Sequence, residues 1–130
     1  MEELERELIA AADSSRRYAR RNYLLGYSVA IATVLSSIVA GLTVSIATVP
    51  KEVTAALASM PAAMVAAGTV FRFDQKSAWF WQKAKRIEAL LRAVRYEAMA
   101  LPEASQQFSL LEVEMERNWI GFGAINRKSD

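Results

Sequence analysis

The chain has 130 residues, 53% of them hydrophobic and 23% charged, and its 16 Lys and Arg against 14 Asp and Glu give a formal net charge of +2. That length fits one compact domain. With no Cys and no His, the sequence excludes disulfide scaffolds, thiol catalysis, zinc sites of the usual ligand set and His-based acid–base chemistry.

The charged residues are segregated along the sequence. Residues 22–71 contain two charged side chains, Lys51 and Glu52, and the other 80 residues carry the remaining 28. A soluble domain spreads charge over all its surface helices, so this distribution argues against one. It predicts an all-α membrane protein in which a two-helix transmembrane hairpin is continuous with a cytoplasmic helical bundle.

Residues 1–21 are expected to form an amphipathic cytoplasmic helix that leads into the membrane. Its apolar stripe is weak but has helical spacing: Leu4, Leu8, Ala11, Ser15 and Tyr18. Four acids suit the N-terminus of a helix, where the dipole is positive: Glu2, Glu3, Glu5 and Glu7. This helix can run unbroken into the first span.

Two uncharged stretches have the length of a bilayer crossing. The stretch before Lys51 has 29 residues and the stretch after Glu52 has 19, whereas a membrane helix needs about 20. We predict transmembrane helices at 22–49 and 53–71, joined in a tight hairpin at Pro50, which cannot continue a helix without loss of a backbone hydrogen bond. One alternative is a cleaved signal peptide, whose apolar core would be about 7–15 residues long and nearer to the N-terminus. The other is a pair of buried core helices in a soluble domain.

Basic residues predict the orientation of the hairpin. They precede the first span and follow the second, at Arg16, Arg17, Arg20, Arg21, Arg72, Lys76, Lys83, Lys85 and Arg86. The turn between the spans has a single Lys. Because positive flanks remain in the cytoplasm, the chain should be a multi-pass protein of the cell inner (cytoplasmic) membrane with both termini cytoplasmic. Nucleic-acid binding is the other interpretation of a basic cluster, but topology already explains it, so we expect no nucleic-acid partner.

Each span has more small side chains than one hairpin can bury. Small residues that allow close backbone approach, together with hydroxyl hydrogen bonds, drive helix packing in lipid. The first span has two such stripes: Gly26, Ala30, Thr33, Ser37, Ala40, Val44 and Thr48, and beside them Ser28, Ala32, Ser36, Val39 and Thr43. The second span has one: Ala55, Ala58, Ala62, Ala66 and Thr69. One stripe can close the hairpin and another can bind a neighbour, so we expect a homo-oligomer rather than a monomeric hairpin.

The spans contain no Asp, Glu, Lys or Arg, so a pore through them would be lined by hydroxyls, small side chains or apolar constrictions. The candidate lining residues are Ser28, Thr33, Ser36, Ser37 and Thr43, although structural hydrogen bonding is the other use for these hydroxyls. Pro61 removes the helical donor for the carbonyl of Leu57, which predicts a kink. That kink is either structural or the hinge of a gate.

The residues after the second span have the pattern of two amphipathic cytoplasmic helices. A heptad seam runs through 72–101: Phe80, Ala84, Ile87, Leu91, Val94, Ala98 and Leu101. Of these, Phe80, Ile87, Leu91 and Val94 are the candidate contacts within a bundle or between subunits. The acids Glu112, Glu114 and Glu116 are expected to meet the basic side of this helix, where surface pairs contribute about 0–1 kcal/mol each.

The second cytoplasmic helix is expected at 102–123, because Pro102 interrupts the preceding seam. Its apolar face is Phe108, Leu111, Met115, Trp119 and Phe122, and Gly121 and Gly123 end it. Residues 124–130 are expected to be a frayed tail.

Taken in order, these residues resemble a known family. An amphipathic helix ends in Arg16-Arg17-Tyr18-Ala19-Arg20-Arg21, and two spans with a very short turn are followed by Phe71-Arg72-Phe73, Trp79-Phe80-Trp81 and Ala89-Leu90-Leu91-Arg92. This order resembles, over nearly the whole chain, the SLATT family of two-transmembrane proteins associated with SMODS and SLOG domains in prokaryotic conflict systems. The resemblance implies a pore-forming membrane effector with a nucleotide-sensing or nucleotide-synthesising partner. Because the chain has no Gly-rich phosphate loop, that partner would be a separate protein.

The sequence therefore predicts a homo-oligomeric membrane pore or channel-like effector, with no cofactor, no metal and no catalytic residues. The alternative is a non-conducting, membrane-anchored interaction module whose bundle recruits a cytoplasmic partner. An enzyme is not expected, since Asp13, Asp74 and the scattered Glu residues form no catalytic constellation.

Overall fold

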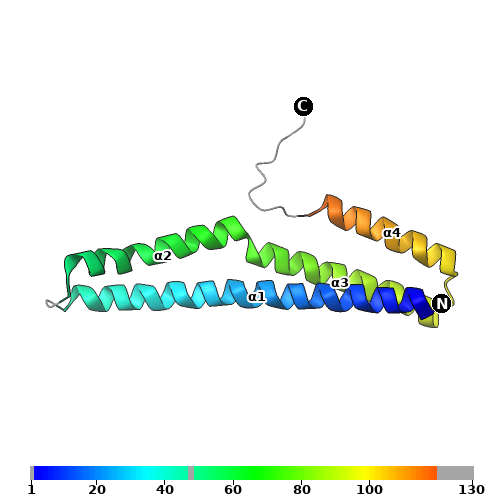
Figure 1. Ribbon diagram of the computed structural model, residues 1–130, viewed down its shortest axis with the longest axis horizontal. Helices are drawn as coiled ribbons and strands as arrows, with labels where there is room; N and C mark the ends of the chain where they lie inside the picture. The colour runs from blue at the N-terminus through cyan, green and yellow to red at the C-terminus, as the bar shows by residue number, and fades with distance from the viewer. Residues whose placement is uncertain (1, 47–48, 120–130) are drawn as a thin grey trace, which may run out of the picture. The chain divides into compact units, whose positions relative to one another are not determined.

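The computed structural model describes residues 2–46 and 49–119, and over these residues the protein is all-helical, as predicted, with no strand (Figure 1). In chain order the helices are α1 (Glu2–Val44), α2 (Lys51–Phe71), α3 (Phe73–Tyr96) and α4 (Leu101–Arg117). They form two compact units, which we call the bundle unit, residues 2–22 and 74–119, and the apolar unit, residues 23–73. The predictions for Thr48, Phe122, Gly121, Gly123 and the tail 124–130 lie outside the described residues.

α1 is a single helix of 43 residues that contributes to both units. No Pro interrupts it, and Glu2, Glu3 and Glu5 in its first turn complement the positive end of its dipole. The predicted cytoplasmic helix 1–21 and the predicted first span 22–49 are therefore one element. The helix ends at Val44, five residues before the predicted end of the span.

The bundle unit has a core in which α1, α3 and α4 each bury one face. Leu8 and Ala12 of α1 pack with Ile87 and Leu90 of α3 and with Phe108 of α4. Leu8 and Ile87 are fully buried, at 0% exposure each. Burial of an aliphatic side chain of this size contributes about 1.5–3 kcal/mol, so these contacts stabilise the bundle within one chain.

α3 ends at Tyr96, earlier than the predicted limit of 101, because the chain turns at Ala98. Ala98 has φ 53°, and the backbone N–H groups of Glu97 and Met99 donate to the carbonyl of Ala93 at 3.1 and 3.3 Å. The first bond is an ordinary i→i−4 helical bond, and the positive φ of Ala98 is the left-handed conformation in which many helices end. The heptad seam therefore stops before Ala98 and Leu101, which are both exposed, and α4 begins at Leu101.

The apolar unit places α2 alongside the C-terminal half of α1. A Cβ atom at Gly68 of α2 would lie 3.8 Å from Cγ1 of Val29 in α1, which is ordinary van der Waals contact. The less exposed face of α2 is Thr54, Leu57, Pro61, Met64, Ala67 and Gly68, and no residue of α2 is fully buried. The predicted packing stripe from Ala55 to Thr69 is not this face.

The two prolines of the apolar unit lie at different positions relative to α2, one just before its start and one in its interior. Pro50 immediately precedes α2, and its carbonyl accepts the N–H groups of Val53 and Thr54 at 3.1 and 3.2 Å. Pro61 lies inside α2, which continues through it without interruption. A Pro at the start of a helix loses no hydrogen bond, whereas one in the interior does.

Ala98 provides a test of the cap that ends α3. Substitution Ala98→Gly should stabilise the protein by about 0.5–1 kcal/mol, because Gly adopts positive φ without the steric cost of a Cβ atom. The same substitution at exposed Ala89, inside α3, should destabilise it by about 1 kcal/mol. Thermal unfolding followed by circular dichroism compares the two, and equal losses would contradict the left-handed cap.

Candidate functional site

The five predicted lining residues of α1 all use their hydroxyl groups within their own helix. Ser28 donates to the carbonyl of Leu24 at 2.8 Å, and Thr33 donates to that of Val29 at 2.8 Å. The other three donate in the same way: Ser36 and Ser37 to Thr33 at 3.0 and 2.8 Å, and Thr43 to Ala40 at 2.9 Å. Each hydroxyl hydrogen is thus satisfied without water, while the oxygen can still accept a hydrogen bond.

These five hydroxyl groups do not all lie on one face of α1. Thr33, Ser36 and Thr43 are half-buried, on the side of α1 that includes buried Ala40. Ser28 and Ser37 are exposed. They are nine residues apart, which places them on opposite sides of a helix with 3.6 residues per turn. At most one of the two exposed hydroxyls can therefore face any single path along α1.

Large apolar side chains cover the exposed surface of α1 in the apolar unit. Leu35, Ile38 and Leu42 are 56%, 54% and 62% exposed, and their spacing by three and four positions places them on one side of the helix. Two stretches, within Glu2–Val44 and within Lys51–Tyr96, are long and apolar enough to cross a membrane. A core helix of a soluble protein would be mostly buried, but the apolar windows of these stretches are 6% and 0% buried within the chain.

The small-residue stripe of α2 is exposed along its whole length. All five of its members are exposed: Ala55, Ala58, Ala62, Ala66 and Thr69. The face of α2 with lower exposure is formed largely by the bulkier Leu57, Pro61 and Met64. The side of α2 that carries these three residues is therefore the less exposed one, and the side with the small-residue stripe stays exposed.

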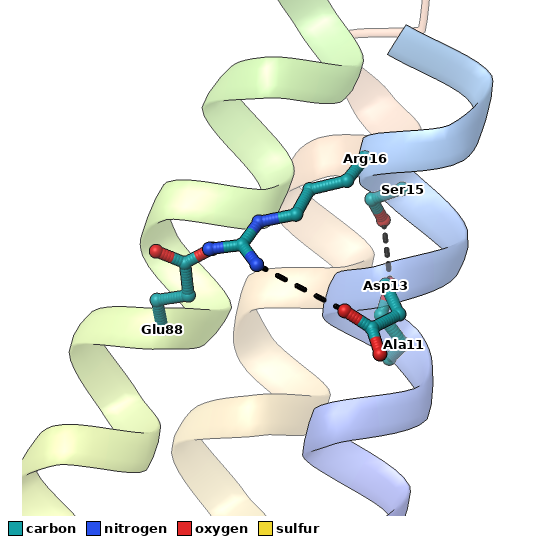
Figure 2. Close-up of polar contacts among 5 residues, drawn as sticks. All are labelled: Ala11, Asp13, Ser15, Arg16 and Glu88. Carbon is teal, nitrogen blue, oxygen red and sulfur yellow. Dashed lines mark hydrogen bonds and ion pairs between the residues drawn. The ribbon is translucent and has the colours of Figure 1, made fainter. Parts of the chain in front are cut away.

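Ion pairs connect the helices of the bundle unit. Arg16 of α1 pairs with Glu88 of α3 and lies 3.9 Å from Asp13 of its own helix, while Ser15 nearby donates to the carbonyl of Ala11 at 2.8 Å (Figure 2). Arg95 of α3 lies 3.4 Å from Glu5 of α1. Such exposed pairs contribute about 0–1 kcal/mol each, so they orient the helices more than they stabilise them.

The predicted pairing of α4 acids with the basic side of α3 is confirmed for two of the three. Lys83 Nζ lies 3.6 Å from Glu112, and Arg86 lies 2.8 Å from Glu114. Between the described residues, no ion pair involves Glu116. The acidic side of α4 therefore faces α3 at the level of Lys83 and Arg86.

An aromatic cluster holds the start of α3 against α1 and the end of α4. Phe80, one of the predicted seam residues, stacks on Tyr18 with ring centroids 5.3 Å apart and contacts Trp79 edge-on at 4.9 Å. Trp79 also meets Trp119 at 4.5 Å, and its indole N–H donates to the carbonyl of Met115 at 3.1 Å. Aromatic pairs in such offset geometries add about 0.5–1.5 kcal/mol to their burial.

The remaining predicted seam residues lie in or against the core of the bundle unit. Ile87 and Val94 are 0% and 4% exposed, and Leu91 packs against the core from its edge. Leu90 and Ala93, which a heptad pattern leaves out, are buried too. A helix that packs against two neighbours buries a wider apolar face than the two-position stripe of a coiled coil. A search of the sequence for this wider apolar face would have identified Leu90 and Ala93.

Two polar side chains near the start of α3 are buried, which the sequence patterns did not predict. Ser77 donates to the carbonyl of Ala19 at 3.0 Å, which ties α3 to α1 at a point where both residues are buried. Lys76, 4% exposed, is also buried, and desolvation lowers the pKa of its ammonium group. Over the described part of the chain, no group of three or more acidic residues has an arrangement that could hold a metal ion.

No protein-family model, curated protein or solved structure matches this chain.

Proposed function

We propose that the chain is a homo-oligomeric membrane pore or channel-like effector of the cell inner membrane. In this proposal α2 and the C-terminal half of α1 form a transmembrane hairpin, and the bundle unit lies in the cytoplasm with both termini. The sequence resemblance to SLATT proteins supports the effector role and a separate nucleotide-sensing or nucleotide-synthesising trigger.

The observation that supports the membrane assignment best is the exposure of the apolar unit. Residues 22–50 and 53–71 contain no charged side chain, and the helices that they form leave Leu35, Ile38 and Leu42 more than half exposed. A monomeric soluble protein rarely exposes a contiguous apolar surface of this length. Transfer of this surface into hydrocarbon leaves no backbone hydrogen bond unmade, because the N–H and C=O groups of a helix pair with one another.

The exposed small-residue stripe of α2 supports assembly. Apolar burial does not drive helices together within lipid, so close packing of small side chains has to supply the association energy. Ala58 and Ala62, at the centre of the stripe, allow the backbone of a neighbouring helix to approach closely. A ring of hairpins that pack through this stripe would leave a path along one side of α1, lined by small side chains and by Ser28 or Ser37.

A membrane-anchored interaction module that does not conduct is the second candidate. It is favoured by apolar side chains on the surface of the bundle unit, since Tyr96, Leu110 and Val113 are 81%, 62% and 56% exposed. Such side chains could contact a cytoplasmic partner. The two functions differ in one observable, the permeability of a membrane that contains the assembled protein.

The packing role of the stripe can be tested with a matched pair of substitutions. Ala58→Leu should raise the dissociation constant of the oligomer at least about tenfold, because a bulky side chain blocks close backbone approach. Ala56→Leu, two positions away and about 200° around the helix, should leave it assembled. Light scattering on the detergent-purified protein measures the subunit number. A wild-type monomer, or equal effects of the two substitutions, would contradict assembly through this stripe.

Conduction can be tested by dye or K⁺ release from liposomes that contain the protein. Wild-type protein should release the probe, and one of Ser28→Leu and Ser37→Leu should reduce the release severalfold, because only one of these opposite faces can line the path. The half-buried Thr33→Val should leave the release unchanged. Tight liposomes that contain assembled wild-type protein would contradict a pore and favour the interaction module.

A further inference from the structure

We propose that Arg17, Arg20 and Arg21 form a binding site for the phosphate groups of anionic lipids. The inference rests on the proposed membrane function and adds a lipid requirement to it. The site belongs to the bundle unit, because all three arginines precede residue 23 of α1.

The first argument comes from the partners of the four arginines in this segment. Arg16 pairs with Glu88 across the helices and lies near Asp13, so acids of the bundle unit neutralise its charge. No ion pair or hydrogen bond to a described residue involves the side chain of Arg17, Arg20 or Arg21, and all three residues are exposed. Three positive charges are therefore left for a ligand outside the chain.

The second argument is the placement of these charges on one side of α1. Residues three and four positions apart are neighbours on a helix surface, so Arg17 is adjacent to both Arg20 and Arg21. Arg17 and Arg21, with Tyr18 beside them, also line an open groove on α1. The acid in this groove is Asp13, which has Arg16 within 3.9 Å. A guanidinium group donates two parallel hydrogen bonds to a phosphate, which makes such a cluster well suited to phosphate groups.

The third argument selects a lipid phosphate over other phosphates. The uncharged stretch begins at residue 22, directly after Arg21. Arg17 precedes it by five residues, about 7.5 Å along a helix, and the headgroup layer of a bilayer is about 5–8 Å deep on each side. With the first span in the membrane, all three guanidinium groups lie at the depth of the lipid phosphates. Attraction to an anionic surface then contributes about a fivefold increase in affinity for each arginine.

The test measures lipid binding to the full-length protein in a neutral detergent by native mass spectrometry. The probes are phosphatidylglycerol, which is anionic, and phosphatidylcholine, which is zwitterionic. Wild-type protein should bind phosphatidylglycerol preferentially, and the triple variant Arg17→Gln/Arg20→Gln/Arg21→Gln should weaken that binding at least about tenfold while phosphatidylcholine binding is unchanged. Because these residues are exposed, the variant should keep its helical content by circular dichroism.

Arg16→Gln is the matched control, since the same charge is removed from the same segment. It should keep the phosphatidylglycerol preference, because the Arg16 charge is already paired within the bundle unit. Equal phosphatidylglycerol binding by wild type and triple variant would overturn the site, as would a loss of preference in Arg16→Gln alone.

Two further outcomes separate this inference from its alternatives. If a fluorescent single-stranded oligonucleotide binds the wild type but not the triple variant, and lipid preference is absent, the cluster binds nucleic acid and the lipid site is wrong. A protein that requires detergent but binds both lipids equally would overturn the lipid site alone. A protein that stays dispersed without detergent would overturn the membrane function on which the site depends.

Discussion

The property on which the whole structure depends is the absence of charge over two helix-length stretches whose apolar surface the chain does not cover. Residues 22–50 and 53–71 contain no Asp, Glu, Lys or Arg, and no residue of α2 is fully buried. In water, exposed surface of this kind would drive aggregation; in hydrocarbon, the same surface is solvated. The proposed hairpin, its cytoplasmic flanks and its assembly through small residues all follow from that difference in solvent.

The bundle unit differs from the apolar unit, because it buries its apolar residues within one chain. Leu8, Ile87 and Phe108 come from three helices and meet in one core, while ion pairs such as Arg86 with Glu114 lie outside it. A unit with its own core can keep α1 and α3 in register without a neighbouring subunit. The heptad-like seam of α3 therefore needs no coiled coil between chains, although the sequence pattern allows one.

Much of the architecture could be predicted from the sequence, and the errors have physical causes. The all-helical class follows from the periodicity, as the structure confirms, and helix starts lie beside Pro50 and Pro102. The end of α3 was placed too late because Ala98 takes a left-handed conformation that is usually Gly. The contact face of α2 was not predictable, because the small and the bulky side of an apolar helix can both pack, and only the structure shows that Leu57 and Met64 lie on the less exposed side. Which hydroxyl group faces the proposed conduction path depends on the arrangement of neighbouring subunits, and a single sequence does not specify that arrangement.

Membrane topology tests the central claim most directly, and the absence of Cys makes the measurement clean. A single thiol introduced as Lys51→Cys, at the first residue of α2, should react with a membrane-impermeant maleimide on intact spheroplasts. A thiol introduced as Ser105→Cys, at an exposed position of α4, should react only after the membrane is opened. Labelling of Ser105→Cys on intact spheroplasts, or recovery of the protein in the soluble fraction, would contradict a two-span hairpin with cytoplasmic termini.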